Sequence, residues 1–553
     1  MIIRTLLDGR TALAVGALLA VMGVVTAAIG LTRPAADPPP ADPPADRSGE
    51  PSKTHAEIPC VPGPEAHEPP CTLWWRRDVP GLTDTVGTRL DRARAGKVKS
   101  LRRLCDRLHS LARRAATDEK MLGCFAVNRR LWALRRRGEA PRALLEKADT
   151  FRKAFNEYYI TRYLAFYDIL FVDRGGDVFY SIRHEDDLGA NLLAPPHRTR
   201  PLGRQLAEAP GEEAFVDFHF YGPSREPAAF FVEPVRIDGR HAGWLVLQCA
   251  ANKINALFGG VADLEPTGES FLVNRDGYML TQSNFQGDST ILERRLAEEN
   301  IRAKFAEGRG HRTVIDYRGV AALSSFEVFE FLGARWLVVV KMDEAQALTE
   351  AYRRDRGAIM DELRRRLSTH SPGPCDAALA RDSRDPVWVD MDEFARARHG
   401  EVLSTVGVAT CTGLVAAYPG RVGYLAHIGP NDRVYGEEDT HLLTTLVDKL
   451  KTYDIYKYQR RHVRFTSVAP HLESLPGVVD TLVDEGFLLT QIDVMTHPGA
   501  RSARMRFDYT DNRIEVTWRI DGGRGGDTYC THRGAEACNV GRMVRDILFD
   551  AAD

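Results

Sequence analysis

The chain has 553 residues, of which 44% are hydrophobic and 27% are charged. Such a composition is ordinary for globular protein, and it excludes a polytopic membrane protein, a collagen-like fibre and a wholly disordered chain. The 74 Lys and Arg residues nearly balance the 76 Asp and Glu residues, which argues against a dedicated nucleic-acid binder. The length predicts two to four domains.

The N-terminal segment has the character of a membrane anchor. Residues 11–32 carry no charge, and a helix of this length, at ~1.5 Å per residue, would extend roughly 33 Å, enough to cross the hydrocarbon core. Arg4 and Arg10 favour a cytoplasmic location for residues 1–10. We therefore predict a single transmembrane helix that acts as a signal anchor. Cleavage after the Ala27-Ala28 pair stays open as the alternative.

The segment after this helix predicts that the rest of the chain lies outside the cytoplasm. Residues 33–72 are rich in proline, which is typical of a stiff, extended linker. The chain has nine cysteines, and close spacing of cysteines in an exported protein suggests disulfides. The close pairs are Cys60/Cys71, Cys105/Cys124 and Cys530/Cys538. A further pairing of Cys249 with Cys375 would leave Cys411 as the free thiol.

The middle of the chain contains an internal repeat. Residues 83–165 are predicted to be helical, with Leu101, Leu104, Leu108 and Leu111 on one apolar stripe. Two similar strand-turn-strand patterns follow, at 167–182 and 269–283. The segments 228–257 and 322–348 also match, and they place Trp244 and Trp336 in equivalent positions. A duplicated α+β unit is therefore predicted.

This repeat resembles the double Cache domain, a tandem PAS-like extracytoplasmic sensor of bacterial chemoreceptors and sensor kinases. The resemblance rests on the segments at 167–193, 215–235 and 267–280, and it predicts an α+β sensor domain over 73–350 with its helices at the N-terminal end. It implies a small-molecule ligand bound by the first unit. By position, the implied ligand-binding residues are Arg183, Asp186, Tyr221 and Phe230, although Arg183 and Asp186 are equally compatible with surface charges on a loop.

The last third of the chain contains a candidate nucleophile. After a predicted linker at 351–384, which includes a helix through residues 361–369, a final domain is expected over 385–553. Residues 402–430 contain two β-rich runs around a turn at Tyr418-Pro419-Gly420, so a hairpin would bring Cys411 close to His427. A neighbouring imidazole can activate a thiol by taking its proton, and Thr405 is a candidate to orient that imidazole. A buried structural cysteine is the alternative interpretation.

The same segment resembles CheD, the chemoreceptor glutamine deamidase family, whose members carry a Thr…Gly-Ser-Cys…His core. The resemblance covers about 400–520 and implies an α/β domain in which Cys411 attacks a glutamine carboxamide, His427 transfers protons and Thr405 orients His427. Two differences from the family are plain: Ala409-Thr410 replaces Gly-Ser, and the segment 465–471 lacks the family's glycine pair.

Together these features predict a single-pass protein of the bacterial inner membrane that carries a periplasmic sensor and a CheD-like domain. It would bind a small molecule and act on a receptor or another protein substrate as a cysteine amidohydrolase. The alternative is a non-catalytic signalling protein that binds its ligand and docks a partner. No sequence motif implies a metal or a cofactor.

Overall fold

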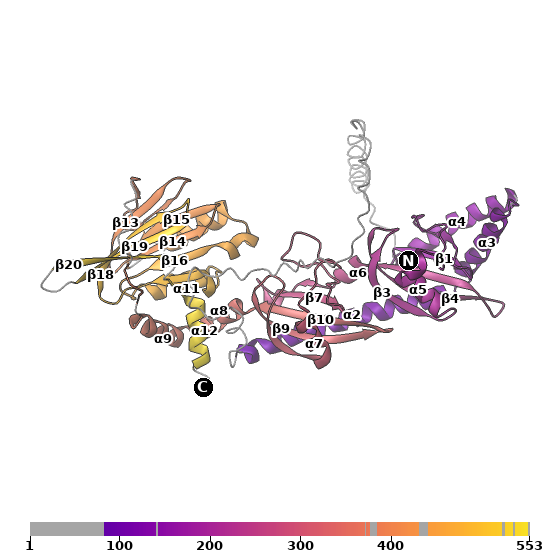
Figure 1. Ribbon diagram of the computed structural model, residues 1–553, viewed down its shortest axis with the longest axis horizontal. Coiled ribbons are helices and arrows are strands. Elements are labelled where there is room, and N and C mark those ends of the chain that lie inside the picture. The colour runs from indigo at the N-terminus through magenta and orange to yellow at the C-terminus, as the bar shows by residue number, and fades with distance from the viewer. Residues whose placement is uncertain are drawn as a thin grey trace, which may run out of the picture. The chain divides into compact units, whose positions relative to one another are not determined.

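The computed structural model describes residues 82–139, 142–370, 372–375, 384–430, 441–521, 526–534 and 537–550. All of them belong to the second of the chain's two units, residues 59–553, and Figure 1 shows their helices and strands. None of the helices in these ranges combines the length and hydrophobicity needed to cross a bilayer. The predicted membrane helix at 11–32, the linker at 33–72, Cys60 and Cys71 lie outside the described residues.

The helical prediction for 83–165 is confirmed by three helices, α2 (Leu82–Ala115), α3 (Glu119–Arg136) and α4 (Arg142–Arg162). Two leucines of the predicted stripe, Leu101 and Leu108, are fully buried, and Leu104 and Leu111 pack against the same cluster. Arginines after residue 100 occupy solvent-facing positions of α2, as expected for an amphipathic helix, whereas Arg94 is buried. Asp118 begins α3 by accepting a hydrogen bond from the backbone N–H of Met121.

The predicted repeat is present as two five-stranded antiparallel sheets. The first repeat has the order β2-β1-β5-β4-β3 and the second has the order β6-β7-β10-β9-β8, so four strands of each sheet follow the same path. The strands are β1 (Asp168–Asp173), β2 (Val178–Ser181), β3 (Ala214–Tyr221), β4 (Glu226–Ile237), β5 (Arg240–Ala250), β6 (Gly259–Gly260), β7 (Glu269–Asn274), β8 (Arg309–Ile315), β9 (Ala321–Phe331) and β10 (Ala334–Asp343). Short helices lie between them: α5 (Pro201–Glu208), α6 (Ala251–Asn255) and α7 (Glu298–Glu307).

The prediction that Trp244 and Trp336 are equivalent is wrong. Trp244 pairs with Val172, the fifth residue of β1, whereas Trp336 pairs with Asn274, the sixth residue of β7. The β4–β5 hairpin contains an irregularity of register near Val235. One extra residue turns every later side chain to the opposite face of a strand. The two indoles therefore enter different hydrophobic clusters.

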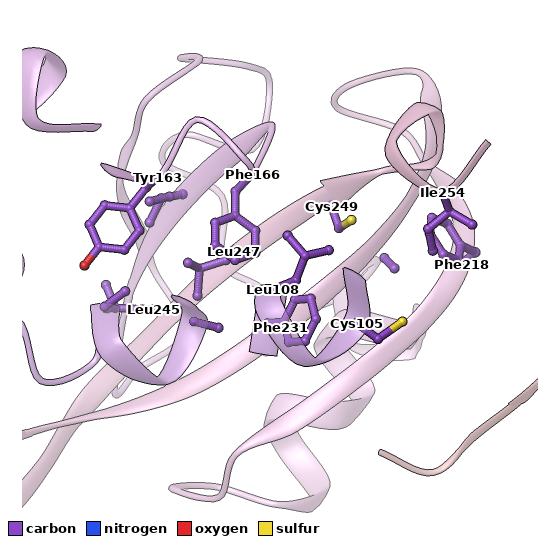
Figure 2. Close-up of a cluster of buried hydrophobic side chains, with 14 of the residues drawn as sticks. Cys105, Leu108, Tyr163, Phe166, Phe218, Phe231, Leu245, Leu247, Cys249 and Ile254 are labelled. Atoms are coloured by element: carbon purple, nitrogen blue, oxygen red, sulfur yellow. The ribbon is translucent and has the colours of Figure 1, made fainter. Parts of the chain in front are cut away.

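Helix α2 packs against both repeats. Its N-terminal part, including Leu82 and Val86, packs with Val340 and Met342 of the second repeat. Its C-terminal part supplies Cys105 and Leu108 to a cluster with strand residues of the first repeat (Figure 2). These contacts make α2 a shared element of the two cores.

A β-sandwich forms the last part of the chain. One sheet has the order β11-β13-β18-β19-β20 and the other β12-β15-β14-β16-β17-β21. The strands are β11 (Val387–Trp388), β12 (Glu393–Arg396), β13 (Val402–Val408), β14 (Thr412–Tyr418), β15 (Val422–Ile428), β16 (Arg464–Val468), β17 (Ile492–Met495), β18 (Ala500–Asp508), β19 (Arg513–Asp521), β20 (Asp527–Arg533) and β21 (Cys538–Asn539).

Helices cover the outer face of the second sheet. They are α8 (Glu344–Arg354), α9 (Arg356–Ser368), α10 (Leu442–Lys449), α11 (Leu475–Asp484) and α12 (Val540–Asp550) (Figure 1). The segment 351–384, predicted as a linker, contains α9, and Ile359, Leu363 and Leu367 of α9 are buried in the core of the sandwich. Helix α8 follows β10 directly, and its Tyr352 hydroxyl donates to Asp480 of α11 at 2.5 Å. The second repeat therefore continues into the sandwich core without a break in structure.

The described cysteines do not form the predicted disulfides. Cys530 is bonded to Cys375, 155 residues away, and not to Cys538. Cys105, Cys124 and Cys249 are buried and not disulfide-bonded, and burial raises the pKa of each thiol to about 12. Spacing along the chain failed as a guide because sheet packing, and not sequence distance, decides which Cβ atoms approach each other.

Candidate functional sites

The first repeat carries a group of buried polar side chains. Asp168 and Gln248 pair across β1 and β5 and are each 1% exposed or less. The hydroxyl of Tyr221 donates to Oδ2 of Asp187 at 2.7 Å, and the Tyr221 ring packs on Phe230 with 4.8 Å between centroids. Oδ1 of Asp187 and Oε1 of Gln248 are buried without a hydrogen-bond partner among the described residues. This repeat therefore keeps two unsatisfied acceptors.

The surroundings of Asp187 disfavour the ionised form of its carboxyl group. Burial, together with repulsion from Asp168 and Glu185, raises the pKa of Asp187 to about 6 despite the hydrogen bond from Tyr221. A cavity of about 180 Å³ lies beside Tyr221 and is also lined by Arg200 and His219. A small molecule with a hydrogen-bond donor would supply what the two acceptors lack.

At the matching position in the second repeat, charged side chains of the protein pair with one another. Glu269 and Lys341 pair across β7 and β10, as Asp168 and Gln248 do in the first repeat. Nζ of Lys341 lies 2.6 Å from Oδ2 of Asp316 and 3.3 Å from Oε2 of Glu269. The hydroxyl of Tyr317 donates to Oε2 of Glu269 at 2.6 Å. The described contacts therefore satisfy the charged groups at this position internally.

The four ligand-binding residues inferred from sequence have different surroundings. Tyr221 lines the 180 Å³ cavity, and the ring of Phe230 packs against the ring of Tyr221. Arg183 is exposed, with its guanidinium over the ring of Tyr167, and Asp186 is exposed. The buried carboxylate is the neighbouring Asp187. Nothing in two consecutive aspartates tells which one points inward, because that depends on the turn after β2.

The predicted hairpin at 402–430 is confirmed by strands β14 and β15. Gly413 pairs with His427, and Cys411 directly precedes β14. Because side chains alternate along a strand, His427 belongs to the sheet face that also carries Leu425 and its partner Val415, and Cys411 lies in the bend directly before β14. That face is the interior of the sandwich. The three candidate catalytic residues are almost fully buried: Cys411 is 3%, His427 2% and Thr405 1% exposed.

Thr405 reaches His427 from the opposite sheet. Its Oγ1 lies 2.8 Å from Nδ1 of His427, so an Nδ1–H that donates to this hydroxyl leaves a lone pair on Nε2. Nε2 is buried without a hydrogen-bond partner among the described residues. Burial lowers the pKa of His427, although Asp392 and Asp390 oppose the shift. A neutral imidazole with an unpaired Nε2 has the protonation state of a general base.

The thiol of Cys411 is in its resting, protonated form. Burial first, and then the charge of Asp392, raises the pKa of Cys411, and hydrogen bonds from Thr410 and the Ala409 backbone oppose the shift. Activation of this thiol therefore requires a proton acceptor, and His427 is the nearest residue of suitable chemistry in the adjoining strand.

A cavity lies at the same edge of the sheet as Cys411. β14 begins where β16 and β17 end, since Gly413 pairs with Val468 and Val468 with Met495. The hydroxyls of Thr412 and Ser474 are hydrogen-bonded, which ties the start of β14 to the segment after β16. An open cavity of about 620 Å³ is lined by the segments after β16 and β17 and by α9. Cys411, His427 and Thr405 are not among the residues that line this cavity.

Comparisons with known proteins gave solved structures only. No family model matches the sequence, and no curated protein matches it. An extracellular ligand-binding receptor from Desulfohalobium retbaense is 12% identical with a TM-score of 0.32, over 46% of this chain and 40% of that one. The extracellular domain of a histidine kinase is 12% identical with a TM-score of 0.35, and the match covers 48% of this chain and 98% of that domain. The ligand-binding domain of the Pseudomonas fluorescens chemoreceptor CtaA, in complex with L-isoleucine, is 14% identical with a TM-score of 0.32. This match covers 48% of this chain and 98% of that domain. The similar structures are thus extracellular or ligand-binding domains of receptors and of a histidine kinase, and this chain spans 40% of the first of them.

Proposed function

We propose that the protein is an extracytoplasmic sensor whose first repeat binds a small molecule with a protonated amine or another hydrogen-bond donor. The observation that carries the proposal is the pair of unsatisfied buried acceptors, Asp187 Oδ1 and Gln248 Oε1. The second repeat has its own ion pairs at the matching position, which favours the first repeat as the ligand-binding one. The Cys375–Cys530 disulfide fits an oxidising compartment.

Replacing Asp187 with Asn is expected to weaken ligand binding by about 10- to 100-fold, because a hydrogen bond to a charged group contributes about 1.5–3 kcal/mol. Binding of a panel of amines and amino acids to the full chain would be measured by calorimetry. Asp186→Asn is the matched control, since Asp186 is the exposed neighbour, and it should bind like the wild type.

The pH dependence tests the same carboxylate. Because burial raises the pKa of Asp187 to about 6, affinity for a cationic ligand should rise between pH 5 and pH 7, as the carboxyl ionises, and Asp187→Asn should remove this rise. Equal binding by the Asp187→Asn and wild-type proteins would contradict the proposal.

A second function, that of a cysteine amidohydrolase, is favoured by the Thr405–His427 hydrogen bond and by the position of Cys411 directly before β14, the strand that pairs with the strand of His427. In this reaction, Nε2 of His427 takes the thiol proton while Sγ of Cys411 attacks the carboxamide carbon of a glutamine side chain. The imidazolium then protonates the amide nitrogen, ammonia leaves and a thioester remains. His427 next takes a proton from water, whose oxygen attacks the thioester, and the products are glutamate and the regenerated thiol.

The dependence of the Cys411 thiol on His427 can be tested without a known substrate. We expect His427→Ala to slow iodoacetamide modification of Cys411 about 10-fold or more at pH 7.5, because general-base assistance contributes 10²–10⁴-fold in many enzymes. Thr405→Val should have an intermediate effect, since it removes only the group that orients the imidazole. The modification rate of each cysteine would be followed by peptide mass spectrometry.

Cys538 serves as the internal control, because it lies outside this site and contacts His370 instead. Its rate should be the same in all three proteins. If Cys411 reacts equally fast with and without His427, or only after unfolding, the amidohydrolase function is wrong. The sandwich would then be a non-catalytic domain that docks a partner.

A further inference from the structure

Three metal-binding side chains from separate segments meet beside the first repeat. They are His109 of α2, Glu213 directly before β3, and Glu233 of β4, and one donor atom from each lies within 4.8 Å of the other two. They line a cavity of about 240 Å³, together with Leu332 from the turn between β9 and β10. The cavity is therefore lined by residues of α2, the first sheet and the second repeat.

Glu233 is the most unusual member of this cluster. It is only 4% exposed and lines the cavity. Its carboxylate makes no hydrogen bond or ion pair with the residues that the structure describes. An isolated buried carboxylate is costly unless a cation compensates its charge.

His109 is held in place by aromatic rings from both repeats. Its ring centroid lies 6.2 Å from that of Phe231, nearly parallel to it, and 6.0 Å from that of Phe331 at an interplanar angle of 88°. Nε2 is buried without a hydrogen bond among the described residues and lies 3.5 Å from Oε1 of Glu213. A ring that is fixed in this way presents a nitrogen lone pair at little further cost in side-chain entropy.

The local charge also favours a cation. Arg113 is bound to Glu213, with Nε 3.3 Å from Oε2, and it leaves Glu233 without an ion pair. One imidazole and two carboxylates form a mixed nitrogen and oxygen donor set, which suits Zn²⁺ and similar transition metals, whereas Mg²⁺ and Ca²⁺ prefer oxygen ligands alone. Tetrahedral ligands at about 2.1 Å from a metal are roughly 3.4 Å apart, so small side-chain movements would close the set.

We propose that His109, Glu213 and Glu233 bind a divalent transition-metal ion of the Zn²⁺ type. Three protein ligands leave a fourth position open toward the cavity. The ion would fasten α2 to the first sheet next to Leu332 of the second repeat, where it would restrict movement between α2 and the two repeats. This site is separate from the acceptors near Asp187 and from Cys411, and its existence does not depend on either proposed function.

The test is Zn²⁺ binding by the full chain after treatment with a chelator and its removal. We expect the wild-type protein to have a binding site for Zn²⁺ that is lost in His109→Gln and in Glu233→Gln, with affinity at least about 100-fold weaker, since even the partners of metal ligands contribute 10- to 100-fold. Bound metal would be measured by equilibrium dialysis and elemental analysis. Bound Co²⁺ should show no thiolate charge-transfer band, because no ligand is a cysteine.

Two exposed residues provide matched controls, Glu212→Gln beside Glu213 and His399→Gln in the sandwich, and both should bind Zn²⁺ like the wild type. Without metal, Glu233→Gln should melt at the same temperature as the wild type or higher, because it removes an unpaired buried charge, and this separates loss of the site from misfolding. Unchanged Zn²⁺ affinity in Glu233→Gln would overturn the proposal. Equal affinity of the wild type for Mg²⁺ and Zn²⁺ would overturn the assigned class of metal.

Discussion

Replacing Lys341 with Met is expected to destabilise the second repeat by about 3–5 kcal/mol, because removal of one partner from a buried ion pair leaves an uncompensated charge. Lys341 is 1% exposed and lies between Asp316 and Glu269. Burial alone would raise the pKa of Asp316, but attraction from Lys341 and Arg318 outweighs burial and holds that pKa below its usual range. Chemical denaturation of the full chain would measure the loss.

The pH dependence of this loss identifies its cause. In Lys341→Met, the carboxyl of Asp316 would lose the attraction that lowers its pKa and would take up a proton more readily, so the destabilisation should be smaller near pH 4 than at pH 7. The double variant Lys341→Met with Asp316→Asn should recover part of the stability. Lys253→Met is the control, since Lys253 is exposed, and it should change stability by less than about 0.5 kcal/mol. A loss that is equal at both pH values would contradict the ionic explanation.

Replacing Cys375 with Ser is expected to destabilise the sandwich by about 2–5 kcal/mol, since the disulfide with Cys530 closes a loop of 155 residues and chain-entropy arguments give a stabilisation near the upper value. The bond holds the segment before β11 to β20, an edge strand of the first sandwich sheet. Urea unfolding would measure the change, and peptide mapping under non-reducing conditions would verify the pairing.

Cys538→Ser is the matched control for this disulfide. Because Cys538 is not disulfide-bonded, its replacement should leave both the Cys375–Cys530 peptide and the stability nearly unchanged. A Cys530–Cys538 peptide in the wild-type map would show that the closely spaced pair forms after all.

Local patterns in the sequence were reliable guides to local structure. The helices over 83–165 followed from the stripe that contains Leu101 and Leu108, and the hairpin with Cys411 and His427 followed from its turn and β-rich runs. The two repeats could be recognised in the sequence because four strands of each sheet have the same order, and the same order requires a similar pattern of apolar residues. One inserted residue near Val235 shifts the register of the hairpin, so the two tryptophans do not occupy equivalent positions.

The candidate sites were only partly predictable. The hairpin was predicted, with Cys411 directly before its first strand and His427 in its second, and Tyr221 was found from its position in the repeat. The buried carboxylate was missed by one residue, since Asp187 and not Asp186 lies inside. Lys341 at the end of a hydrophobic strand gave no sign that Asp316 and Glu269 surround it, because those partners come from other strands and loops.

The sequence by itself predicted the helices over 83–165, the duplication in the middle of the chain, and the hairpin that carries His427 and begins directly after Cys411. These features depend on periodicity and on contacts within a few residues of a turn. Only the tertiary structure decided the Thr405–His427 hydrogen bond between sheets, the Cys375–Cys530 bond, and the convergence of His109 with Glu213 and Glu233. Such contacts join distant segments, and they depend on how sheets and helices pack and on the face that each side chain occupies.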